Sequence, residues 1–169
     1  ETTIPPQRSR RSSLAIRRAV SEHPIISKYF KVLGADSMVP AEFRKSGFKD
    51  FLTPGTTWVT ALKAMQEDEF FLDPTRMTLV CGTAGYDGTA FKGLLASKYN
   101  IQLNKTSRNS VLLQSNINNT RSDVALLIKV LLEIAMEIDA RLAEGGEAER
   151  AAFAARVKSL MTDVPDLPN

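Results

Sequence analysis

The stretch that decides the fold is TLVCGTAGYDGTAFKGLL, which covers residues 78–95. Its start belongs to a short, mostly apolar run over residues 77–81, whose β-branched members predict a buried strand. A glycine-rich loop follows, and Asp87 or Thr89 then offers a cap for a helix expected over about 89–99. The stretch therefore predicts a strand, a tight loop and a capped helix.

Three glycines in this loop, Gly82, Gly85 and Gly88, stand three residues apart, an arrangement that invites comparison with phosphate-binding loops. No Gly-Lys-Ser/Thr follows, as a P-loop requires, and the first two glycines are not two apart, as a dinucleotide-binding loop requires. A helix N-terminus still attracts anions, but Asp87 at that end would repel a phosphate while it caps the helix. We expect a turn whose glycines take positive φ, with anion binding as the alternative.

The sequence after this loop predicts further strands and helices of the same domain. The further elements expected are strands at 101–105 and within 110–118 and helices over about 120–143 and 147–161. The first of these helices has the clearest signal, a capping box at Thr120 and Asp123. The order from residue 76 is β-α-β-β-α-α, which predicts an α+β fold with a small, mostly antiparallel sheet covered by helices.

The N-terminal part of the chain is less regular in its pattern. Residues 1–13 combine Pro-Pro, Ser and Arg with little to bury and predict a linker or mobile arm. Helical runs follow over 14–33, with a break at His23-Pro24. A helix capped by Thr56-Thr57 is expected through Met65, with Trp58, Leu62 and Met65 on one face. We divide the chain into an N-terminal arm with a helix, 1–47, and a domain over 48–169.

Composition and charge limit the kinds of partner and the cellular compartment that we expect for this chain. The 169 residues carry a net charge of +3, and no apolar run approaches the roughly 20 residues that a bilayer span needs, so no membrane partner is expected. The first twenty residues are basic, but no aromatic residue interleaves with their arginines, which makes nucleic acid an unlikely partner. The single cysteine, Cys81, cannot form an internal disulfide, which fits a cytoplasmic protein.

The residues offer no complete catalytic set. His23 is the only histidine, so a cluster of histidines is excluded, and because it stands before a proline we expect no Ser/His/Asp triad around it; no spacing of ligands indicates a metal site. Cys81, at the end of a buried strand with no nearby base, is expected to be a packing residue. A Schiff-base lysine needs an apolar pocket or a cationic neighbour. The lysines considered for that role are Lys92, Lys98, Lys105, Lys129 and Lys158, of which Lys105 stands out most.

An ordered series of short motifs resembles the bacterial inducible ornithine/lysine/arginine decarboxylases, which use pyridoxal phosphate. The motifs are Phe71-Leu72-Asp73-Pro74, Tyr86-Asp87-Gly88-Thr89, Lys105-Thr106, Val111-Leu112-Leu113, Thr120 and the closing PDLPN at 165–169. The resemblance covers about residues 48–169 and is firmest from 70 to 142. No single motif is diagnostic, so the resemblance depends on their order.

The resemblance implies an aspartate-aminotransferase-like fold, of which this chain supplies the smaller C-terminal α+β domain. The cofactor lysine, in a Ser-x-His-Lys segment that is not found here, belongs to the large domain of that family, and so does the aspartate that pairs with the pyridine nitrogen. The chain is then expected to hold no catalytic or cofactor residue itself. It would act with a large pyridoxal phosphate domain and with further subunits of a homo-oligomer, on a basic amino acid that is decarboxylated.

The residues expected to face the substrate are Asp87 and Tyr86. Family members often carry an acid two positions before the aspartate aligned with Asp87, facing the distal cation of the substrate, and this chain has Gly85 there. That departure puts the basic substrate in question. Two alternatives stay open: an anion- or nucleic-acid-binding module, and an interaction domain with an exposed apolar face.

Overall fold

The structure is a computed structural model that describes residues 6–116 and 118–162, with side chains described from residue 10 onwards. The described part has an α+β fold with seven α-helices, two short 3₁₀ helices and four strands. The helices are α1 (Pro6–Glu22), α2 (Ile26–Tyr29), α3 (Ala35–Met38), η1 (Ala41–Phe43), α4 (Trp58–Glu67), η2 (Gly82–Ala84), α5 (Gly88–Tyr99), α6 (Arg121–Glu144) and α7 (Gly146–Met161). The strands are β1 (Lys31–Val32), β2 (Arg76–Val80), β3 (Lys105–Thr106) and β4 (Ser110–Gln114).

The four strands form one open antiparallel sheet in the order β1-β2-β4-β3, which confirms the expected α+β class with its antiparallel sheet. The central pair aligns Met77 with Leu113 and Leu79 with Val111. The edge strand β1 comes from the N-terminal part of the chain and pairs Lys31 with Val80.

The strand expected over 101–105 is wrong for most of its length, because β3 contains only Lys105 and Thr106. Asn100 ends α5 in the left-handed region, at φ 55°, and the amide of Ile101 donates to the carbonyl of Leu95. Leu103 is buried in the core. The segment before Lys105 is therefore placed by the helix end and by the core rather than by pairing with β4.

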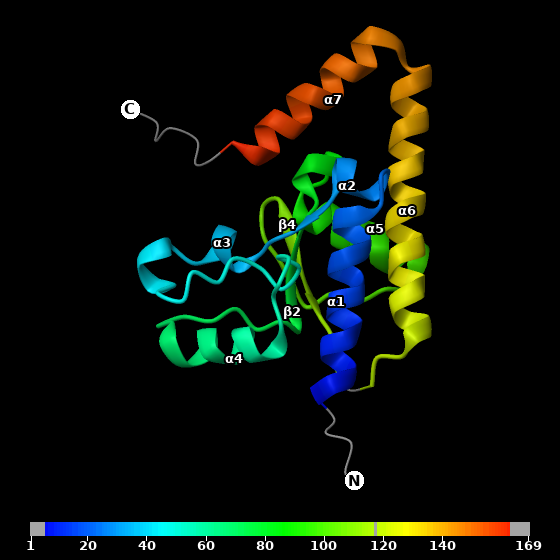
Figure 1. Cartoon of the computed structure of the whole chain (residues 1–169). Helices are drawn as coiled ribbons and strands as arrows, with labels where there is room; N and C mark the ends of the chain where they lie inside the picture. Colours follow the sequence, from blue (N-terminus) through cyan, green and yellow to red (C-terminus); the bar gives the residue numbers. More distant parts are fainter. Residues whose placement is uncertain (1–5, 117, 163–169) are drawn as a thin grey trace.

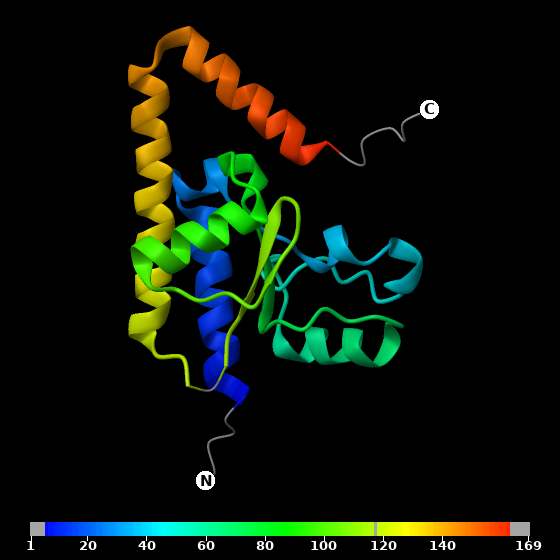
Figure 2. The same cartoon turned by 180° about the vertical axis from the view of Figure 1, so that it is seen from behind.

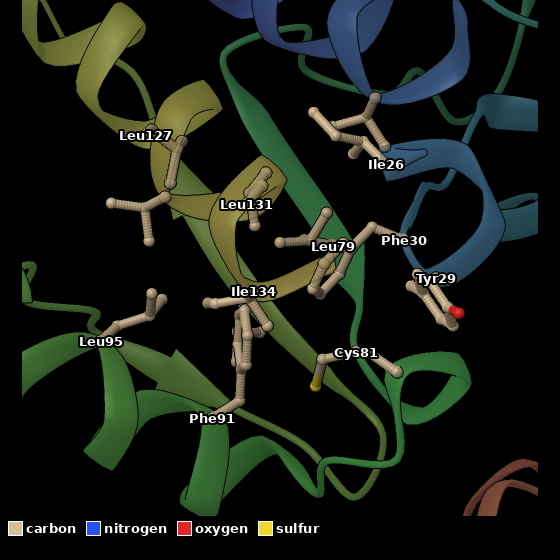
Figure 3. Close-up of a cluster of buried hydrophobic side chains, with 14 of the residues drawn as sticks. Ile26, Tyr29, Phe30, Leu79, Cys81, Phe91, Leu95, Leu127, Leu131 and Ile134 are labelled. Atoms are coloured by element: carbon tan, nitrogen blue, oxygen red, sulfur yellow. The ribbon is translucent and has the colours of Figure 1, made fainter. Parts of the chain in front are cut away.

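The helices α1, α5 and α6 lie on one side of the sheet, and the segment from α3 to α4 lies on the other (Figures 1 and 2). The main core fills the space between the sheet and these helices. Figure 3 shows Leu79 of β2 facing Phe91 of α5 and Leu131 and Ile134 of α6. A smaller cluster, with Phe48, Phe51, Ala61 and Ala64 buried, holds α4 in place.

The linker expected over residues 1–13 is wrong from Pro6 onwards, because α1 begins there, while residues 1–5 lie outside the described part. A proline is well suited to the first turn of a helix, where its missing N–H is not needed. Further along α1, Ser13 and Arg17 are buried. The Arg17 guanidinium donates to the carbonyls of Leu33 and Arg76, at 3.0 and 3.3 Å. Both partner residues are distant from Arg17 in sequence, and their contacts hold this polar, arginine-rich helix against the rest of the fold.

The break expected at His23-Pro24 is confirmed, since α1 ends at Glu22 and α2 begins at Ile26. The Nδ1 of His23 accepts hydrogen bonds from the amides of Ile25 and Ile26, at 3.2 and 3.4 Å, and so caps the next turn. The main core contains residues of α1 and α2 together with residues of α5 and α6, and so draws on both sides of the division placed between 47 and 48.

The helix expected after Thr57 is confirmed as α4, with Thr57 and Thr60 forming a capping box. Its buried face consists of Ala61 and Ala64. The large apolar side chains that the sequence places on one face, Trp58, Leu62 and Met65, are exposed. The capping box at Thr120 and Asp123 and the helices at either side of Gly145 are also confirmed.

Candidate functional site

The candidate site is the loop between β2 and α5. After β2 the chain makes the short helix η2, turns at Gly85 with φ 79°, and enters α5 at Gly88. The expected positive φ is confirmed for Gly85 alone among the three glycines. Gly88 serves close approach instead: a Cβ there would lie 2.1 Å from the carbonyl oxygen of Ser107. The loop is thus fixed against the 107–110 turn.

Gly82 and Gly85 leave room for helix α7. A Cβ on Gly82 would lie 2.7 Å from the sulfur of Met161, and one on Gly85 would lie 3.0 Å from the ring of Phe153. The three regularly spaced glycines are therefore explained by packing: Gly88 lets the 107–110 turn approach the loop, and Gly82 and Gly85 let helix α7 approach it.

Asp87 is the N-cap of α5, as expected, and its Oδ1 accepts a hydrogen bond of 2.8 Å from the amide of Ala90. Its other oxygen, Oδ2, lies 3.3 Å from a guanidinium nitrogen of Arg156 on α7. The Asp87 side chain is 38% exposed and that of Arg156 is 54% exposed. A carboxylate that occupies the helix N-terminus leaves that position unfavourable for an anion, which counts against the phosphate alternative.

Tyr86 is adjacent to Asp87 in sequence, but its ring serves the core. It is half-buried, and its ring centroid lies 5.7 Å from that of Phe91. Its amide donates to the carbonyl of Cys81, which closes the turn around Gly85. Of the two residues expected to face a substrate, Asp87 presents a half-exposed charge and Tyr86 packs on the core.

Cys81 is fully buried, and burial raises the pKa of its thiol to about 12. A buried thiol with a raised pKa is a poor nucleophile, because the thiolate is the reactive form, and this agrees with the expected packing role.

The lysines do not have the surroundings that a Schiff base needs. Lys105 is exposed in β3, and so are Lys98, Lys129 and Lys158, while Lys92 is half-buried. A hydrogen bond of 2.5 Å from Lys98 to Glu137 raises the pKa of that ammonium, the opposite of the change that activates an amine.

Arg156 is the residue of the site that sequence reasoning missed. It is 69 residues away from Asp87 and lies in a helix whose polar residues carry no local motif. Only the packing of α7 over the loop brings the two charges together.

The described residues contain no group of three or more His, Cys, Asp or Glu side chains that could hold a metal ion. None of the helices within 6–116 and 118–162 combines the length and the apolar character that crossing a membrane requires. Comparisons of the chain with models of protein families, with curated proteins and with solved structures found no match.

Proposed function

We propose that the chain is the small C-terminal domain of a pyridoxal phosphate-dependent decarboxylase that acts on a basic amino acid. The motif order around the 82–88 loop supports this proposal, and one observation carries it. The Asp87 carboxylate, on a loop fixed by its glycines, is half-exposed and already holds a guanidinium at 3.3 Å. A loop that accepts a guanidinium from its own chain has the chemistry to bind the cationic end of arginine, lysine or ornithine.

Pyridoxal phosphate does not fit the described residues of this chain. The five candidate Schiff-base lysines are exposed or half-buried. The glycine-rich 82–88 loop, which resembles a phosphate-binding loop in its spacing, has the negatively charged Asp87 at the start of its helix. Within the proposal, the cofactor is held by a large domain, where it supplies an electron sink when CO₂ leaves. The role left to this chain is to orient the substrate through its distal charge.

The test uses the complete protein that carries this chain, assayed for CO₂ release from lysine, arginine and ornithine. Asp87→Asn keeps a good helix cap and removes the charge, so we expect KM for the basic substrate to rise on the order of tenfold with kcat little changed. The matched control is Asp123→Asn, which removes a charge at the N-terminus of α6. No CO₂ release from any of the three would contradict the proposed activity, and an unchanged KM would contradict the role of Asp87.

A second candidate function is an interaction domain that pairs with another copy of itself. The observation in its favour is the exposed stripe of Trp58, Leu62 and Met65 along one face of α4, since a helix face of this kind can form a two-fold contact. Light scattering of the chain should then detect dimers that Leu62→Glu abolishes. A monomer at all concentrations would remove this candidate.

The nucleic-acid alternative loses support from the same structure. Of the described arginines near the N-terminus, Arg17 is buried, Arg10 stacks 5.2 Å above the ring of Trp58, Arg18 pairs with Glu22, and Arg11 is exposed. These arginines therefore form no continuous basic arm for a phosphate backbone.

A further inference from the structure

Arg156 makes two contacts with the candidate site. Its terminal nitrogen lies 3.3 Å from Oδ2 of Asp87, and its Nε donates to the carbonyl of Gly85, also at 3.3 Å. The guanidinium thus joins the charge and the backbone of the same loop. In chemical terms it occupies the place that the cationic end of a basic amino acid would take on Asp87.

The helix that carries Arg156 is attached to the rest of the molecule by few apolar contacts. Leu160 is the only residue of α7 that is buried, and Phe153 is half-buried between the ring of Tyr29 and the guanidinium of Arg141. Met161 also lies against the loop at Gly82. The polar contacts of α7 include the hydrogen bonds from Arg108 to the carbonyl of Ser159 at 2.7 Å and from Asn109 to that of Leu160 at 3.4 Å. On the side of α6 they include the ion pair of Arg141 with Glu149 at 3.2 Å and the hydrogen bond from Arg150 to the carbonyl of Leu142 at 3.3 Å. Helices with little buried apolar surface open at a lower free energy than the core.

The junction between α6 and α7 permits such an opening. Gly145 ends α6, and Gly146 begins α7 with φ 69°, a conformation that glycine adopts without strain. Figure 1 shows α7 crossing from the end of α6, away from the layer formed by α1, α5 and α6. A change at this junction would move α7 and leave the core packing of α6 intact.

We propose that Arg156 is an internal competitor for the Asp87 carboxylate and thereby selects for cationic ligands. This inference rests on the proposed function in one respect, namely that Asp87 binds the distal charge of the substrate. A ligand with an ammonium or guanidinium replaces Arg156 on Asp87, and α7 is then released from the loop. A neutral ligand of the same shape has no charge to offer the carboxylate, so the Arg156 contact persists and α7 stays docked.

The experiment follows the backbone amides of residues 1–169 by NMR while L-arginine is added, with L-citrulline as the uncharged isostere and NaCl as the ionic-strength control. We expect L-arginine to shift the Ala90 amide, which is bonded to Asp87, and to speed hydrogen exchange in α7 beyond the effect of NaCl. Arg156→Gln should bind L-arginine about two- to fivefold more tightly, the range that the loss of an exposed ion pair gives. Its α7 amides should already exchange quickly without ligand.

The matched control is Arg150→Gln, since Arg150 lies on the same helix and its described hydrogen bond goes to the carbonyl of Leu142 rather than to Asp87. This variant should behave as the unaltered chain does. Equal responses to L-arginine and L-citrulline, or equal effects of the two variants, would overturn the inference. The outcome is separate from the activity assay: release of CO₂ with an unresponsive α7 refutes the competition alone, whereas an α7 that responds to L-arginine without any CO₂ release refutes the decarboxylase alone.

Discussion

The hydroxyl of Tyr29 on α2 donates a 2.5 Å hydrogen bond to Oδ1 of Asp139, near the end of α6. The other oxygen of Asp139 accepts from Lys28 at 2.9 Å. The two bonds lower the pKa of Asp139, and burial together with the Asp139 bond raises the pKa of Tyr29 to about 12. One carboxylate thus connects the short helix α2 to the longest helix of the fold.

Replacing Tyr29 by Phe removes this bond and should lower the free energy of unfolding by about 1–2 kcal/mol, since the acceptor is charged. Urea denaturation measures the change. Tyr99→Phe is the matched control, because its bond to Glu133 is longer, at 3.3 Å, and should matter less. A loss as large in Tyr99→Phe as in Tyr29→Phe would show that the Asp139 bond has no special weight.

The same pair predicts how stability depends on pH. The Asp139 pKa is lowered in the folded state, so its contribution is present above about pH 4 and is lost as pH falls through the folded pKa. The Tyr29 pKa is raised, so its contribution is complete below about pH 10 and disappears as pH rises towards 12. Denaturation curves of the unaltered chain and of Tyr29→Phe should therefore converge at both extremes. A constant difference from pH 3 to pH 12 would contradict this.

Arg17→Met should destabilise the fold by about 3 kcal/mol, because the carbonyls of Leu33 and Arg76 lose their buried donor. Arg18→Met is the neighbouring control: its side chain is 65% exposed, its ion pair is with Glu22, and its effect should stay within about 0.5 kcal/mol. Thermal or urea unfolding gives both values. If the two variants lose equal stability, the bonds from Arg17 on α1 to Leu33 and to Arg76 on β2 do not stabilise the fold.

Gly88→Ala should prevent close packing of the loop, because the added methyl group would lie 2.1 Å from the oxygen of Ser107 and 2.6 Å from that of Ser110. Both are backbone atoms that cannot rotate away, so we expect a loss of about 3 kcal/mol or more. Gly93→Ala in the same helix meets nothing within 4 Å and should instead stabilise by about 0.5–1 kcal/mol. Urea denaturation should therefore show a lower free energy of unfolding for Gly88→Ala and a higher one for Gly93→Ala. A change in the same direction for both variants would contradict this prediction.

Cys81 should not react with a thiol reagent such as a disulfide dye at pH 8 while the chain is folded. The thiol is fully buried and its pKa is about 12, so both access and the thiolate are lacking. Addition of guanidinium chloride should give one equivalent of reaction within minutes. Rapid reaction of the folded chain would contradict the packing role.

Features whose partners are close in sequence were predictable. The caps at Asp87, Thr57 and Thr120 bind amides three residues away, so their pattern is visible in the letters themselves. The strands β2 and β4 were likewise found from their apolar runs.

The features that failed depend on distant partners. Helix α1 has a linker-like composition, and its order comes from contacts of Arg17 with carbonyls 16 and 59 residues away. At the site, Asp87 was predicted, but its partner Arg156 was not, because 69 residues separate them. The strand predicted over 101–105 was too long, because the alternation of Ile101 and Leu103 does not reveal that Leu103 packs in the core instead of belonging to a strand.

The buried position of Arg17 has a consequence for how the chain folds during synthesis. Its acceptor on Arg76 follows 59 residues later, so this hydrogen bond cannot form until β2 has been made. At about 5–20 residues per second, this interval lasts on the order of several seconds. Helix α1 is thus made before β2, and its contact with Arg76 joins two segments that are far apart in sequence, the kind of contact that slows folding.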